Sequence, residues 1–150
     1  MERTIRFLNR RKTPWGQVQT VTEWDYRSGI TDILARTKRN EVIAFEAKLS
    51  DWRRAIYQAY RNTTFALRSY VVLPEHVARR AQKSPDTFMN YGVGLCACAD
   101  GELSVLIEAR YSEPLMEWLT RRAHATFDGL INGTRPTGSD RRRQNPLSAA

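Results

Sequence analysis

The sequence predicts an α/β domain with a mixed central sheet flanked by helices and with an added C-terminal hairpin and helix. Three observations support this fold class. Three consecutive segments rich in β-branched and aromatic residues are joined by short polar connections, which favours an antiparallel meander. An apolar stripe with helical spacing follows them. A short apolar run after that stripe is typical of a buried strand.

The first half of the chain begins with a short basic helix, expected over residues 2–11 because Ile5 and Leu8 lie three positions apart. It ends before Pro14. The three strands of the meander are predicted at residues 18–26, 30–36 and 42–49. With the main helix and the strand that follow the meander, the order is helix, three strands, helix, strand (αβββαβ).

The main helix is predicted from apolar side chains three and four positions apart, with Ser50 or Asp51 as its N-cap. Its stripe consists of Trp52, Ala55, Ile56, Ala59, Tyr60, Thr63 and Leu67. The later elements begin with a strand at 69–74 and a short helix at 75–83 ended by Pro85. Strands at 92–99 and 102–109 flank the Asp100–Gly101 turn. A last helix runs from Pro114 to about Phe127, with Leu115, Trp118 and Leu119 on one side.

Two carboxylates and a lysine stand out in the meander. Asp32 lies in the second predicted strand, and Glu46-Ala47-Lys48 closes the apolar run of the third. Alternation places Glu46 and Lys48 on one face and Phe45, Ala47 and Leu49 on the other. If the two strands are neighbours, both carboxylates and the Ala47 carbonyl lie close together. Such oxygen ligands suit Mg²⁺ or Mn²⁺ rather than zinc. Alone, an acid-x-lysine pattern is also typical of a solvated strand face.

Thr31-Asp32 followed, 46 − 32 = 14 positions later, by Glu46-Ala47-Lys48 resembles the PD-(D/E)XK nuclease superfamily, which has the restriction-endonuclease-like fold. Thr31 stands where the family has proline. Gln58 matches a glutamine on the helix after the lysine strand. The aromatic residue expected four positions later is replaced by Asn62, although tyrosines 57 and 60 are close by. The resemblance covers roughly residues 2 to 110 and extends to the αβββαβ order.

This resemblance implies roles for individual residues. Asp32, Glu46 and the Ala47 carbonyl would bind the metal, and Lys48 would orient water or stabilise developing charge. Gln58 would steady the site or contact nucleic acid, with an ordinary helix-surface amide as the alternative. Two further acids are candidates for the extra carboxylate that some relatives carry, namely Glu2 on the first helix and Glu23 on the first strand.

Charge favours a polyanionic partner. The chain has 24 Lys and Arg against 16 Asp and Glu, a net charge of +8 and a pI near 10.0. We expect DNA, with RNA not excluded and an ordinary basic domain as the alternative. The phosphate contacts are expected from the two basic helices, which would flank one groove leading to the metal, through Arg53, Arg54 and Arg61 and through Arg6 and Arg10.

Domain organisation follows from composition. Residues 1–132 are expected to form one nuclease-like domain, and residues 133–150 a disordered basic tail, because the tail is poor in apolar side chains. No apolar run approaches the ~18 residues of a membrane span. We therefore predict a soluble, cytoplasmic protein with no membrane partner, in which Cys96 and Cys98 are reduced thiols. A homodimer is an open alternative to a monomer.

Together these features predict a Mg²⁺-dependent nuclease that hydrolyses DNA phosphodiester bonds. The chain shows no helix-turn-helix or zinc finger. A structure- or context-directed enzyme of repair, recombination or phage biology is therefore favoured over one that reads sequence. The alternatives are a catalytically silent nuclease-like fold that binds DNA or regulates, and a protein-interaction module such as a phage anti-defence protein.

Overall fold

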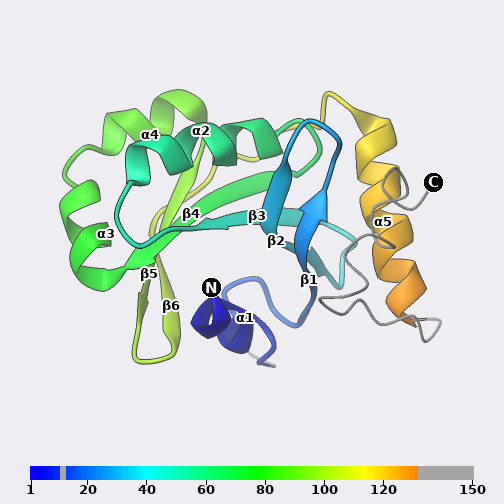
Figure 1. Cartoon of the computed structure of the whole chain (residues 1–150), viewed down its shortest axis with the longest axis horizontal. Coiled ribbons are helices and arrows are strands. Elements are labelled where there is room, and N and C mark those ends of the chain that lie inside the picture. The colour runs from blue at the N-terminus through cyan, green and yellow to red at the C-terminus, as the bar shows by residue number, and fades with distance from the viewer. Residues whose placement is uncertain (11–12, 132–150) are drawn as a thin grey trace.

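The computed structural model describes residues 1–10 and 13–131 and confirms a mixed α/β architecture (Figure 1). The predicted tail at 133–150 lies outside the described residues. In chain order the elements are α1 (Glu2–Leu8), β1 (Val18–Asp25), β2 (Ile30–Thr37), β3 (Val42–Ala47), α2 (Trp52–Asn62), β4 (Arg68–Pro74), α3 (Glu75–Ala81), α4 (Pro85–Tyr91), β5 (Gly94–Ala99), β6 (Glu102–Ile107) and α5 (Glu117–Ile131).

The six strands form one sheet in the order β1-β2-β3-β4-β5-β6. Strands β1, β2 and β3 pair antiparallel, as the short connections predicted. Strand β4 is parallel to β3 across the α2 connection, and β5 is parallel to β4. Strand β6 returns antiparallel beside β5. Asp100 (φ 52°) and Gly101 (φ 74°) both have positive φ, as a two-residue type I′ hairpin turn requires.

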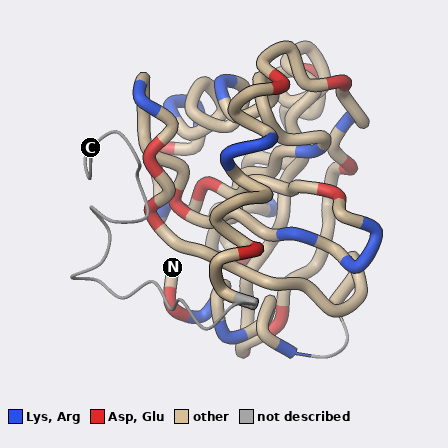
Figure 2. The backbone as a smooth tube through the Cα atoms, turned by 90° about the vertical axis from the view of Figure 1, so that its right-hand side faces the viewer, with Lys and Arg blue, Asp and Glu red and all other residues tan. Residues whose placement is uncertain are grey.

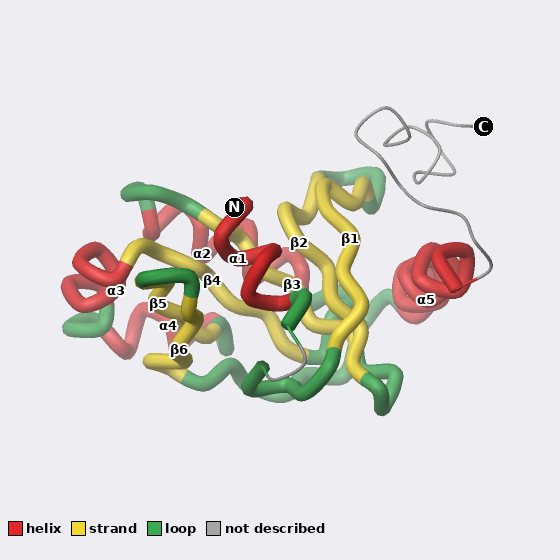
Figure 3. The backbone as a smooth tube through the Cα atoms, turned by 90° about the horizontal axis from the view of Figure 1, so that it is seen from below, coloured by secondary structure: helices red, strands yellow, loops and turns green. Residues whose placement is uncertain are grey.

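Helices cover both faces of the sheet, and β3 shows the division residue by residue. Ile43 and Phe45 pack on the face covered by α1, in one core cluster with Leu8. Val42 and Ala44 point to the opposite face, where they pack with α5. Helix α2 and its neighbours α3 and α4 lie against that same face further along the sheet. Figure 3 shows α1 crossing the sheet on its own and α5 at the β1 end.

Several predicted elements are longer than the observed ones, and two of them, β3 and α2, border the candidate site. Strand β3 ends at Ala47, and Leu49, expected on the core face, is 81% exposed because the chain leaves the sheet to reach the α2 cap. Helix α2 ends at Asn62 and does not continue to Leu67. The hydroxyls of Thr63 and Thr64 bond the carbonyls of the residues three positions earlier, a local competition that ends helices.

The second half differs in two helices. Pro85 was expected only to end a helix, but it begins α4, since proline suits the first helical turn. Helix α5 begins at Glu117 and not at Pro114, because the preceding segment pairs with the α2–β4 connection, where the Met116 N–H donates to the Thr64 carbonyl at 2.9 Å. Its buried residues are Leu119, Ala123 and Phe127, whereas Leu115 and Trp118, predicted to share a side with Leu119, are exposed.

Within residues 1–10 and 13–131, no helix combines the length and the apolar character needed to cross a membrane. Both cysteines are free thiols, and Cys96 is buried.

Gly94 gives a direct test of this packing. A Cβ at this position would lie 2.5 Å from Tyr70 Cδ1 and 2.7 Å from the Ala109 backbone nitrogen. Tyr70 is fully buried, so the ring has no room to retreat. We expect Gly94→Ala to lower the free energy of unfolding by roughly 1–3 kcal/mol, the usual cost of overpacking. Urea unfolding measures this, with Ser104→Ala, at an exposed position of β6, as a control that stays near wild type. Equal midpoints for both variants would contradict the close approach of β5 to Tyr70.

Candidate metal centre

The candidate site occupies a gap between two neighbouring strands. The β2–β3 ladder ends at the pair Ile33–Phe45. Beyond that pair, the Asp32 N–H donates to Glu46 Oε2 at 3.1 Å, and the Ala47 N–H donates to Asp32 Oδ2 at 3.0 Å. Each carboxylate therefore accepts a hydrogen bond from a backbone N–H of the other strand. On its other edge β3 stays paired with β4, so the opening lies on the β2 side alone.

Asn62 holds the buried member of the pair in place. Its Nδ2 donates to Glu46 Oε2 at 3.1 Å, and its Oδ1 accepts from the Thr31 hydroxyl at 2.9 Å. Glu46 and Asn62 are each 1% exposed, and Thr31 is fully buried. Asn62 occupies the position where the resemblance called for an aromatic residue, and its contact with Glu46 was not expected. One signal was available, since an amide three positions after Ala59 continues the apolar stripe of α2.

Burial, and after it the negative charge of Asp32, raise the pKa of Glu46 from its ordinary 4.5 to about 7. The Asp32 N–H, the Asn62 amide and the Lys48 charge act in the opposite direction, because each favours the ionised form. The side chain therefore titrates near neutrality, unlike an exposed glutamate.

Lys48 follows the last residue of β3 and is half-buried. Its backbone N–H still donates to the Val72 carbonyl at 3.0 Å, which continues the pairing with β4. Its charge lowers the pKa of Glu46, so the ammonium lies within electrostatic range of the acid pair. Ala47 packs against the α1 face, and the contact it makes with the pair is through its N–H.

The oxygen donors present fit a hard divalent cation. Asp32 Oδ1 and Glu46 Oε1 have no hydrogen-bond donor among the described residues. Gln58 Oε1 is also buried without a donor there, and Gln58 lies one helical turn before Asn62, on the same side of α2. Two carboxylate oxygens with waters suit Mg²⁺, which binds through few protein ligands.

The further acids named from the sequence do not complete this set. No group of three or more His, Cys, Asp or Glu side chains lies together in metal-binding geometry in the part of the chain that the structure describes. Glu2 is on α1 and lines a cavity of about 480 Å³ that Ala47 and Lys48 also line. Glu23 lies between the residues paired with Ile33 and Thr31 and has positive φ (51°).

The arginines predicted to bind phosphate lie on two sides of the molecule. Those of α2 (Arg53, Arg54 and Arg61) and those of α1 and its C-terminal end (Arg6 and Arg10) are all exposed. The expectation that the two helices flank one groove is wrong, because they cover opposite faces of the sheet (Figure 1). Figure 2 shows acidic positions interspersed with basic ones along the backbone on the side that carries α5.

Comparisons with known proteins place the chain by fold alone. No protein-family model matches it, and no curated protein sequence matches it. A solved structure of a protein of unknown function from Silicibacter pomeroyi superposes with a TM-score of 0.51 at 13% sequence identity. The match covers 81% of this chain and 84% of that chain. This similarity supports the mixed α/β fold.

The raised pKa of Glu46 has a consequence for stability. Between its ordinary pKa of 4.5 and about 7, the unfolded state loses a proton that the folded state keeps. Stability therefore falls as pH rises through this window, by roughly 3 kcal/mol in total for this group. We expect Glu46→Gln, which retains an acceptor but does not ionise, to gain stability relative to wild type across the same window. Urea unfolding as a function of pH measures the difference.

Glu102→Gln, at the exposed first position of β6, is the control and should follow the wild-type curve. If the Glu46→Gln curve also runs parallel to wild type, Glu46 does not titrate in this range.

Proposed function

We propose that the chain has the restriction-endonuclease-like fold and acts as a Mg²⁺-dependent nuclease on DNA. The observation that carries the proposal is the meeting of Asp32 and Glu46 between β2 and β3, with Lys48 two residues after Glu46. The element order αβββαβ, with β4 parallel to β3, supports it independently.

Asp32 Oδ1 and Glu46 Oε1 are the atoms proposed to hold the cation, and Gln58, one helical turn before Asn62, is proposed to steady the site. When bound, Mg²⁺ supplies Lewis-acid chemistry that activates water and neutralises phosphoryl charge. Asn62 keeps Glu46 oriented, and the Asp32 and Ala47 amides fix the two carboxylates relative to one another. Lys48 orients the attacking water or stabilises the charge that develops on the phosphate.

The substrate is proposed to be recognised by structure or context. Arginine contacts to phosphate hold a nucleic acid without reading its bases. Arg53, Arg54 and Arg61 lie on the same helix as Asn62, which touches Glu46. The arginines of α2 are therefore proposed to contact the substrate phosphates, whereas Arg6 and Arg10 lie toward the other face of the sheet.

A second candidate is a catalytically silent nuclease-like fold that binds DNA or regulates. Its specific support is the burial of Glu46, which is 1% exposed and already bonded to Asn62 and Asp32. A carboxylate in that position serves as a structural acceptor without any cation. The two candidates make opposite predictions about metal binding and turnover.

Cleavage tests the first candidate. Purified protein is incubated with plasmid, single-stranded, flap and junction DNA in Mg²⁺, Mn²⁺ or EDTA. We expect metal-dependent cleavage that Lys48→Ala reduces by roughly 10²–10³-fold, the usual cost of losing one transition-state stabiliser. Asp32→Asn and Glu46→Gln should abolish cleavage together with metal binding.

The matched controls are Lys38→Ala, at an exposed lysine in the β2–β3 turn, and Asp86→Asn, at an exposed aspartate on α4. Both should cleave as wild type does. Cleavage that survives in every site variant would assign the activity to a contaminant. Wild-type protein that binds DNA without cutting any substrate would favour the silent fold.

Metal binding should release a proton. At a pH below about 7 much of Glu46 is protonated, and a cation binds the ionised form. Calorimetric Mg²⁺ titrations in two buffers of different ionisation enthalpy measure the protons released. We expect release below pH 7 that fades as pH rises above it, and neither release nor tight binding in Glu46→Gln. Binding without proton release would show that the cation does not engage Glu46.

A further inference from the structure

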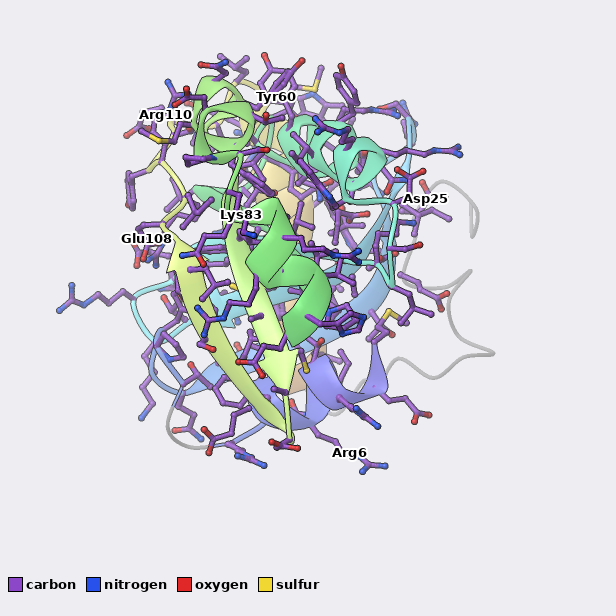
Figure 4. The ribbon with its side chains drawn as sticks, turned by 90° about the vertical axis from the view of Figure 1, so that its left-hand side faces the viewer. Arg6, Asp25, Tyr60, Lys83, Glu108 and Arg110 are labelled. Carbon is purple, nitrogen blue, oxygen red and sulfur yellow. The ribbon has the colours of Figure 1, made fainter. Side chains whose placement is uncertain are left out.

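Three tyrosines gather on the outer side of α2 and the end of α4. Tyr57 and Tyr60 are 57% and 49% exposed, and their ring centroids lie 5.4 and 5.2 Å from the ring of Tyr91 in edge-on geometry. We call these three residues the tyrosine cluster. Figure 4 shows Tyr60 between the ribbons of α2 and α4, on the far side of the molecule from Arg6.

The exposed side of α2 combines these rings with positive charge. At about 100° per residue, the exposed positions of the helix fall within an arc of roughly 120°. They are Arg53, Arg54, Tyr57, Tyr60 and Arg61. The opposite side carries the buried Ala55, Ile56, Ala59 and Asn62. No acidic residue lies between Trp52 and Asn62, so this surface is aromatic and cationic throughout.

The charge of these arginines is not neutralised within the described residues, where none of the three forms an ion pair. The Arg53 guanidinium stacks over the Trp52 ring at 4.3 Å, and Arg61 donates to the Ser28 carbonyl. Contacts with a ring and a carbonyl hold the guanidinium groups in place and leave their charge available for a polyanion.

We propose that the tyrosine cluster, with Arg53 and Arg54, is a stacking platform for single-stranded DNA. Exposed aromatic rings beside arginines are what unpaired bases and their phosphates require, because each base offers a π-face and each phosphate a negative charge. In a duplex the base faces are already stacked on each other, so the rings gain no contact. The assignment of single-stranded DNA as the substrate of the acid pair rests on the proposed function. Helix α2 links the two surfaces, because Asn62 at its end bonds Glu46.

Binding is tested without turnover, in EDTA, by the fluorescence anisotropy of a labelled oligo(dT) of about 20 nucleotides, long enough to exceed a typical single-strand site. Matched ligands are a duplex of the same length, an oligo(U), and an abasic oligonucleotide that keeps the phosphates and lacks the bases. We expect wild type to bind oligo(dT) more tightly than any of these three.

The variants separate stacking from charge. Tyr57→Ala and Tyr60→Ala should each weaken oligo(dT) binding roughly tenfold and leave abasic binding unchanged, whereas Tyr57→Phe and Tyr60→Phe should bind as wild type, because phenylalanine still stacks. Tyr111→Ala is the control, since Tyr111 is 55% exposed but bonds Glu41 and does not contact the cluster. Thermal unfolding establishes that each variant is folded.

Equal affinity for duplex and oligo(dT), or alanine variants that bind as wild type, would overturn the proposal. Tighter binding of oligo(U) would overturn the assignment to DNA. Self-association of wild type that the alanine variants abolish, with no preference for single strands, would assign the surface to a second copy of the chain. Tyrosine-dependent binding by a protein that never cuts would keep this proposal and reject the nuclease. Cleavage by a protein whose DNA binding does not depend on the tyrosines would reject this proposal and keep the nuclease.

Discussion

The site depends on the two hydrogen bonds that join β2 and β3 beyond the last pair of their ladder. Where the ladder stops, two backbone N–H groups, those of Asp32 and Ala47, need acceptors, because an unpaired amide inside a sheet is costly. The carboxylates of Glu46 and Asp32 supply them. The same two bonds that close the sheet therefore bring two acids together and leave one oxygen of each without a donor among the described residues.

This arrangement carries an electrostatic cost that bears on function. Glu46 is buried beside a second carboxylate, and its pKa rises to about 7 in consequence. A glutamine at position 46 would accept the same bonds from Asp32 and Asn62 without burying a charge. A divalent cation would offset that cost, because it favours the ionised form of both acids. The proposed cation would therefore offset a cost that a glutamine at position 46 would not carry.

Sequence reasoning predicted the parts of the molecule that follow from periodicity. The meander, the hairpin at Asp100–Gly101 and the buried side of α2 were expected, and Asp32 and Glu46 were placed on neighbouring strands. Tyr60, predicted in the apolar stripe of α2, is instead 49% exposed on its outer side. It did not predict details that depend on tertiary contacts. The side of the sheet that each helix covers separates Arg6 from the arginines of α2, and local pattern does not encode it. The role of Asn62 depends on a bond to Glu46, 16 positions away.

Helix α2 joins the two surfaces of functional interest. Its inner side presents Asn62 to Glu46, and its outer side presents the tyrosine cluster. The proposed binding of a divalent cation by the acid pair can be tested by anomalous diffraction from crystals soaked in Mn²⁺. We expect one anomalous peak within coordination distance of Asp32 Oδ1 and Glu46 Oε1, absent in Asp32→Asn. Wild-type crystals with no peak there, or with a peak only elsewhere, would contradict it.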